Sequence, residues 1–102
     1  MPTKPMLIEV TRLDINKGEP LGEYTCPIAL ALQRNLKLPK ADIRVWSISL
    51  NLDVNEHQLN WRYPNYVKTW VREFDANLPV APFSFKLPAY LVTKISKHKN
   101  KR

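Results

Sequence analysis

The chain has 102 residues, of which 44% are apolar and 25% charged, proportions typical of one folded globular domain rather than a disordered chain. Its single cysteine excludes an internal disulfide and favours a reducing compartment, so we expect a cytoplasmic protein. No apolar run approaches the roughly 20 residues that a membrane-spanning helix needs, and the first residues lack the pattern of a signal peptide.

Positive charge is concentrated at the carboxyl end of the sequence. The net charge is +7, but residues 1–85 hold ten basic and nine acidic residues, a net of +1. Residues 86–102 contain no acidic residue, and their six basic residues are Lys86, Lys94, Lys97, Lys99, Lys101 and Arg102. The sequence therefore predicts a nearly neutral body followed by a basic tail.

The first expected elements are a strand and a short helical turn. Residues 6–11 combine β-branched side chains with apolar residues at every second position, which is typical of a strand with one buried face. Residues 13–18 predict a single helical turn that ends at Gly18, where we expect the left-handed conformation open to glycine.

A long uncharged run at residues 24–32, which includes the only cysteine, predicts a central helix over residues 27–36. Pro27 suits the first turn of a helix, because no hydrogen-bonded N–H is needed there. Thr25 or Cys26 would be the N-cap, and Thr25 is the better capping residue. Apolar residues fall on nearly all sides of the first two turns, so we expect this helix to be covered on several faces.

A β-hairpin is expected next. Apolar and polar residues alternate over residues 46–54 and again over residues 58–63, which predicts two antiparallel strands joined by a turn. Trp46 and Ile48 belong to the apolar face of this pattern, so we expect both side chains to be buried.

The last part of the chain contains a helix, a strand and a tail. The helix would begin with Asn65 as its N-cap and end near Asn77. Residues 80–87 predict a proline-flanked short strand, whose prolines suit either an edge strand or the start of a strand. Residues 89–96 are compatible with either helix or strand, and residues from Lys97 on are expected to form a disordered tail.

The element order is therefore β-α-β-β-α-β, followed by an extension. It predicts an α+β fold in which two helices cover one face of a small antiparallel sheet, with the ferredoxin-like topology as the leading arrangement. The alternative is a smaller α+β fold whose only sheet is the hairpin. We expect residues 1–88 to form a compact domain and residues 89–102 to form a C-terminal extension that ends in the basic tail.

The run Cys-Pro-Ile-Ala-Leu-Ala-Leu at residues 26–32 is distinctive. Shorter motifs accompany it, namely Thr11, Asp14-Ile15, Gly18, Phe74-Asp75, Pro79-Val80 and Pro82-Phe83-Ser84-Phe85. Together they resemble a family of small uncharacterised bacterial, especially cyanobacterial, and phage proteins, over residues 6–87. The resemblance implies neither an activity nor any catalytic residue.

Cys26 is a candidate nucleophile, because the N-terminus of a helix lowers the pKa of a thiol. A nucleophile also needs a base, and His57 in an expected turn and His98 in the tail are not obviously placed for that task. We therefore interpret Cys26 as a packed, buried residue, and we expect no catalytic residues.

Neither a metal site nor a cofactor is expected. One cysteine and two scattered histidines do not form a zinc-ligand set. With only two glycines, the chain also lacks a phosphate-binding loop and a nucleophile-elbow motif. The sequence therefore does not predict an enzyme.

The aromatic residues could stack on nucleobases, but most of them fall on apolar stripes, which favours a role in the core. The polar face of the expected hairpin is poor in aromatic residues, and this argues against an RNA-recognition motif. That face carries Ser47, Ser49, Asn51, Gln58, Asn60 and Arg62.

Two functions are compatible with these patterns. The first is a non-enzymatic interaction module that binds and modulates a protein partner as an adaptor or inhibitor. The second is a nucleic-acid-binding accessory protein whose tail contacts phosphates without reading sequence. The candidate polyanion- or partner-binding residues are Lys94, Lys97, Lys99, Lys101 and Arg102. Acidic lipids are another target for such a tail, and a solubilising tail is the simplest alternative.

Overall fold

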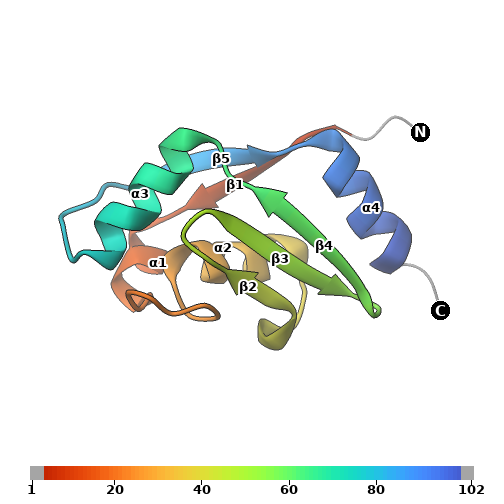
Figure 1. Ribbon diagram of the computed structural model, residues 1–102, viewed down its shortest axis with the longest axis horizontal. Helices are drawn as coiled ribbons and strands as arrows, with labels where there is room; N and C mark the ends of the chain where they lie inside the picture. The colour runs from red at the N-terminus through yellow and green to blue at the C-terminus, as the bar shows by residue number, and fades with distance from the viewer. Residues whose placement is uncertain (1–3, 100–102) are drawn as a thin grey trace.

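Figure 1 shows the computed structural model, which describes residues 4–99 as helices and antiparallel strands. In chain order the elements are β1 (Met6–Val10), α1 (Arg12–Lys17), α2 (Pro27–Leu36), the 3-10 turn η1 (Lys40–Asp42), β2 (Ile43–Val45), β3 (Ser49–Val54), β4 (His57–Arg62), α3 (Asn65–Asp75), β5 (Phe83–Leu87) and α4 (Ala89–Lys99). The expected α+β class is therefore confirmed.

The strands of residues 4–99 form two small antiparallel sheets. β1 pairs with β5, with Ile8 opposite Phe85, and the second sheet has the order β2-β3-β4. A ferredoxin-like order would join the β1–β5 pair to the hairpin within one sheet, so this finer prediction is not confirmed. Between β4 and β5 the two sheets are in contact through side chains and not through backbone pairing. Trp61 of β4 stacks on Phe85 of β5, with ring centroids 6.0 Å apart.

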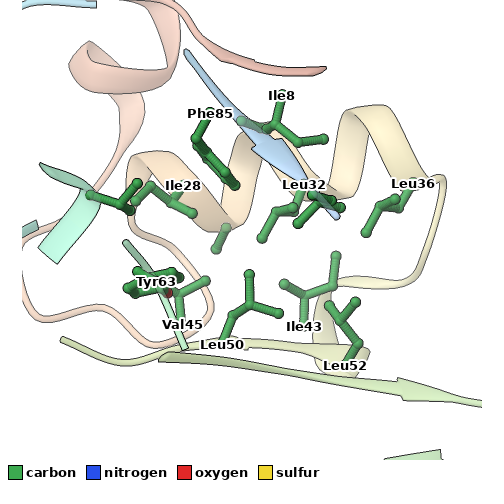
Figure 2. Close-up of a cluster of buried hydrophobic side chains, with 14 of the residues drawn as sticks. Ile8, Ile28, Leu32, Leu36, Ile43, Val45, Leu50, Leu52, Tyr63 and Phe85 are labelled. Carbon is green, nitrogen blue, oxygen red and sulfur yellow. The ribbon is translucent and has the colours of Figure 1, made fainter. Parts of the chain in front are cut away.

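Helix α2 supplies the centre of the hydrophobic core. Ile28 and Leu32 are fully buried, and the helix contacts both β1 and β2. In Figure 2, Ile43 and Leu50 approach α2 from one side and Phe85 from another. The expected central helix, covered on several faces, is therefore confirmed.

The ends of the helices differ in detail from the prediction. Cys26, not Thr25, is the N-cap of α2, and its Sγ accepts a hydrogen bond from the Ala29 amide at 3.5 Å. Pro64 takes the N-cap position of α3, so Asn65 is the first helical residue and not the cap. Proline suits this position because its ring fixes φ near −60°, a value that the extended backbone of an N-cap allows. Proline also has no backbone N–H that would need a hydrogen-bond acceptor.

Gly18 ends α1 as expected but is not left-handed, with φ −76° and ψ 154°. The reason for glycine is space. A Cβ at this position would lie 2.5 Å from Cδ of Pro27, at the start of α2. Gly18 thus permits a close approach between the loop after α1 and the central helix.

The predicted strand over residues 46–54 begins later and is preceded by a tight turn. The Trp46 amide donates to the Ser49 carbonyl at 2.8 Å, so β2 folds back on β3 and Val45 pairs with Leu50. Trp46 and Ile48 lie in this turn with 36% and 48% of their surface exposed. The prediction that both are buried was wrong, because alternation continues through a turn without showing where the chain reverses.

The prediction of a disordered tail from Lys97 is wrong for residues 97–99, which continue α4. The helix buries Leu91, Val92 and Ile95 and packs against β3 and β4. Residues 100–102 of the expected tail lie outside the described residues. Whether residues 1–88 form a domain without α4 stays a prediction.

Candidate binding site

The loop between α1 and α2 is closed by its own backbone. The Gly22 amide donates to the Glu19 carbonyl at 3.2 Å, and the Cys26 amide donates to the Gly22 carbonyl at 3.0 Å. At its tip, Leu21 has a φ of 61° and 79% of its surface is exposed. A left-handed backbone is uncommon for a non-glycine residue and costs free energy. The loop therefore holds an apolar side chain in water in a strained conformation.

Two polar contacts attach this loop to the rest of the fold. The Leu21 amide donates to Oδ1 of Asp75, the last residue of α3, at 2.9 Å. The Val45 amide donates to the Glu23 carbonyl at 2.8 Å, so the loop also covers part of the outer edge of β2. These contacts place the loop beside the turn that carries Trp46.

A pocket of about 230 Å³ opens where these three segments meet. It is lined by loop residues 21–23, turn residues 45–47, Cys26, Val71 and Asp75. We call this pocket, together with its exposed apolar lining residues Leu21 and Trp46, the anchor site. A more open pocket of about 560 Å³ adjoins it and shares Gly22 and Glu23.

Cys26 lies at the floor of the anchor site but lacks the chemistry of a nucleophile. Burial raises the pKa of its thiol to about 11, and the nearby Asp75 carboxylate adds to this effect. A thiol with that pKa is protonated near neutral pH, and the thiolate is the reactive form. The two histidines stack on each other, with ring centroids 3.8 Å apart. These observations favour Cys26 as a packing residue.

Tyr63 is buried beside Val45, one of the residues that line the pocket (Figure 2). Its hydroxyl is buried and has no hydrogen-bond partner among residues 4–99. Burial raises the pKa of the phenol far above its ordinary value, with Cys26 and Asp75 contributing in the same direction. The three side chains thus share one electrostatic environment.

The five residues of the predicted basic site do not share one environment. Lys94 and Lys97 are exposed on α4, and Nζ of Lys94 lies 5.9 Å from the centre of the Tyr90 ring. Lys99 has a structural contact, because its Nζ donates to the Leu36 carbonyl at the end of α2 at 2.7 Å. Lys101 and Arg102 lie outside the described residues.

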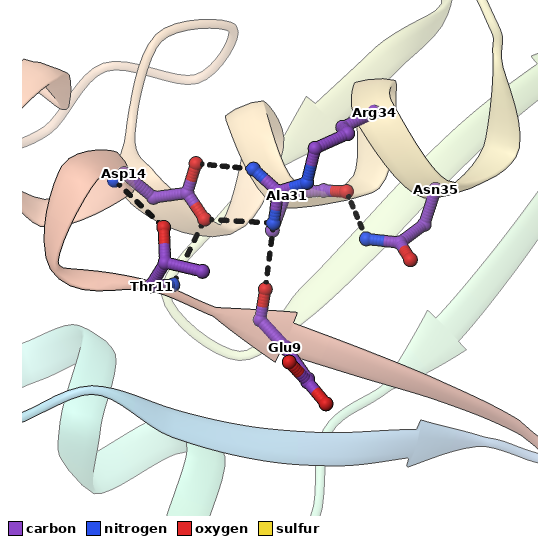
Figure 3. A network of polar contacts seen from close by, with 6 residues as sticks. All are labelled: Glu9, Thr11, Asp14, Ala31, Arg34 and Asn35. Atoms are coloured by element: carbon purple, nitrogen blue, oxygen red, sulfur yellow. Dashed lines mark hydrogen bonds and ion pairs between the residues drawn. The ribbon is translucent and has the colours of Figure 1, made fainter.

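A second cluster of charged residues joins β1, α1 and α2 (Figure 3). Both carboxylate oxygens of Asp14 accept from Arg34, at 2.7 and 3.0 Å, and Arg34 also donates to the Glu9 carbonyl at 2.9 Å. Thr11 and Asp14 complete a reciprocal capping box at the start of α1. Because these groups satisfy one another, we interpret the cluster as structural.

Sequence reasoning missed the anchor site and the Asp14–Arg34 pair. A signal for the pair was present, since Thr11 and Asp14 have the spacing of a capping box. No comparable local pattern marks the anchor site, whose lining comes from three separate segments.

Residues 4–99 contain no cluster of three or more histidine, cysteine, aspartate or glutamate side chains that could hold a metal ion. No helix within this part of the chain is long and apolar enough to cross a membrane. No family model, curated protein or solved structure matches the chain. The family resemblance of the run at residues 26–32 stays a prediction.

Proposed function

We propose that this chain is a small interaction module that binds a protein partner through the anchor site. The observation that carries this proposal is the exposure of Leu21 and Trp46 at a pocket that is also lined by the buried side chains of Val45, Val71 and Cys26. Single exposed apolar residues are common, but a cluster beside a concave floor is typical of interaction surfaces.

The loop conformation supports the same proposal. Leu21 is held with a left-handed backbone by the Asp75 contact, and it gains little burial in return. Strained residues that are held in place by surrounding contacts tend to occur at functional sites. Tryptophan, the residue type at position 46, is enriched among the interface side chains that contribute most to binding energy.

Site-specific photo-crosslinking in the native cell tests this function. A photoreactive amino acid is placed at position 21 in one variant and at position 7 in a control, because Leu7 is also an exposed apolar residue but lies on β1. We expect a discrete protein adduct from position 21 that Trp46→Ala abolishes, and no such adduct from position 7. Equal adducts from both positions, or none, would contradict the proposal.

A second candidate, nucleic-acid binding, is favoured by the exposed face of α4. Helix α4 contains three lysines and no acid. Lys94 and Lys97 are exposed about one turn apart, and Lys94 lies beside the Tyr90 ring. Such a face binds phosphates by releasing counterions, so its affinity falls steeply with salt. This mode needs no base-specific contact.

A salt titration on mixed-sequence RNA and DNA tests the second candidate. Replacing Lys94 and Lys97 by glutamine should weaken binding and reduce the salt dependence. The matched control replaces the exposed Lys4 and Lys17, which removes the same charge elsewhere. If both pairs behave alike, the α4 face is not a specific phosphate-binding surface.

A further inference from the structure

We infer that the anchor site selects a linear protein segment with one large apolar side chain beside lysine or arginine. This inference rests on the proposed function, because it names the partner chemistry of the same site. It combines two observations: apolar side chains form much of the pocket lining, and the acidic residues Glu23 and Asp75 line the pocket without a lysine or arginine beside them in the lining.

The charge of the anchor site is opposite to that of the whole chain. Glu23 and Asp75 line the pocket, and no lysine or arginine does so, although the net charge is +7. Asp75 has no ion pair with any cation of residues 4–99, and its Oδ1 accepts from the Leu21 amide. Glu23 is partly neutralised by Arg44 at 3.9 Å. Asp75 is therefore the main source of negative potential at the site.

The size of the pocket limits how the partner enters. About 230 Å³ between Leu21 and Trp46 accommodates one side chain of leucine, methionine or phenylalanine size, but no folded element. Burial of that side chain against Val45 and Val71 supplies affinity. A cation placed next to it in the partner sequence would meet Asp75 at the pocket edge, where complementary charge adds specificity and speeds association.

Strand addition is a less suitable binding mode here. The outer edge of β2 is occupied at Val45, whose amide donates to the Glu23 carbonyl. A partner strand would have to displace this contact before it could pair with β2. The site therefore favours recognition through an inserted side chain.

The test is selection from a displayed library of random linear peptides against the folded full chain. We expect the enriched peptides to share one large apolar residue adjacent to lysine or arginine. Binding of a synthetic peptide made from that consensus should weaken about tenfold or more with Trp46→Ala, as is usual for a central aromatic contact.

The charge contribution is tested separately with Glu23→Gln and Asp75→Asn combined. Both changes remove charge but keep an acceptor oxygen, so the Asp75 contact with the Leu21 amide is retained. We expect consensus-peptide affinity to fall by about threefold or more and to lose most of its salt dependence. The control combines Asp53→Asn and Glu56→Gln on the β3–β4 hairpin, and it should leave affinity unchanged.

The outcomes distinguish this inference from the function on which it rests. Peptides that depend on Trp46 but show no preference for basic residues would overturn the inference and leave the interaction module standing. Enrichment of acidic peptides would overturn it in the same way. If no enriched peptide depends on Trp46, both the inference and the anchor site as a binding surface are wrong.

Discussion

The Asp14–Arg34 pair shows how a single carboxylate connects three elements. Burial raises the pKa of Asp14, but hydrogen bonds from Arg34 and Thr11 outweigh it and leave the pKa below the ordinary value of 3.8. A carboxyl group whose pKa is lower in the folded than in the unfolded chain stabilises the fold at pH values above its unfolded pKa. That stabilisation is lost as the pH falls through the folded value.

Asp14→Asn should lower the free energy of unfolding at neutral pH by about 1–3 kcal/mol, because Arg34 loses its charged acceptor. Arg34 is half exposed, so water compensates part of the loss. Urea unfolding from neutral to acidic pH measures the effect, with the exposed Glu56→Gln as control. The difference between wild type and Asp14→Asn should shrink below pH 3.8; a constant difference would contradict the electrostatic explanation.

Tyr63→Phe should leave stability unchanged or raise it by about 1 kcal/mol, because it removes a buried hydroxyl that has no partner among residues 4–99. The edge-on contact with Trp61, at 5.9 Å between ring centroids, is available to phenylalanine as well. The control is Tyr24→Phe. The Tyr24 hydroxyl accepts a hydrogen bond from Nε of Arg44 at 2.7 Å, so its removal should cause a small loss of stability. A clear loss of stability in Tyr63→Phe would show that its hydroxyl has a stabilising partner.

At the scale of elements, α2 contributes most to the core because both sheets pack on it. Its buried apolar residues leave no room for water to replace a missing side chain, since Ala29, Ala31 and Leu32 are fully buried, whereas Leu30 is only partly buried. Close-packed surroundings relax only partly when a side chain is shortened. The helix should therefore be sensitive to truncation at its buried apolar positions, such as Ile28, Leu32 and Leu36.

Leu32→Ala should lower the free energy of unfolding by about 2–5 kcal/mol through a cavity at the centre of the core. Leu13→Ala on α1 is the matched control, because Leu13 is 59% exposed and its truncation should cost about 0.5 kcal/mol or less. Urea denaturation of both variants gives the comparison. Similar losses at the two positions would mean that Leu32 is not enclosed.

At the scale of the whole molecule, the last residues of α4 contact segments that are distant in the sequence. The side-chain amide of Asn55 donates to the carbonyls of His98 and Lys99, and the His98 ring stacks on His57. Nζ of Lys99 reaches the last turn of α2. These contacts join the hairpin turn, the central helix and the C-terminal helix.

Deletion of residues 97–102 should therefore lower the melting temperature by about 4 °C or more, since a loss of 1 kcal/mol has that effect in a domain of this size. Deletion of residues 100–102 alone is the control, because it keeps the contacts of His98 and Lys99 with Asn55, His57 and Leu36. Thermal unfolding followed by circular dichroism compares the two. Equal melting temperatures would show that the end of α4 does not stabilise the fold.

The same two deletions show which basic residues contribute to polyanion binding. If polyanion affinity falls equally with both, the basic residues beyond Lys99 carry the effect. If it falls only with the longer deletion, Lys97 or Lys99 contributes. Either result is compared with the salt dependence of the full chain.

Much of the local structure follows from short-range patterns in the sequence. The Pro27 start, the alanine and leucine content and the apolar spacing predicted α2 with its observed bounds, Pro27–Leu36. Alternation predicted β1 and the β3–β4 hairpin to within a few residues. These features depend on periodicity and backbone preferences that neighbouring residues share, so one segment is sufficient to recognise them.

Long-range pairing required the folded chain. Alternation does not say which edges pair, so it could not show that β1 and β5 form a sheet apart from β2-β3-β4, nor that the chain reverses at Trp46. Residues 89–96 were equally compatible with helix and strand until burial against β3 and β4 favoured the helix. The anchor site belongs to the same class, because Leu21, Trp46 and Asp75 come together only when loop, turn and helix pack against one another.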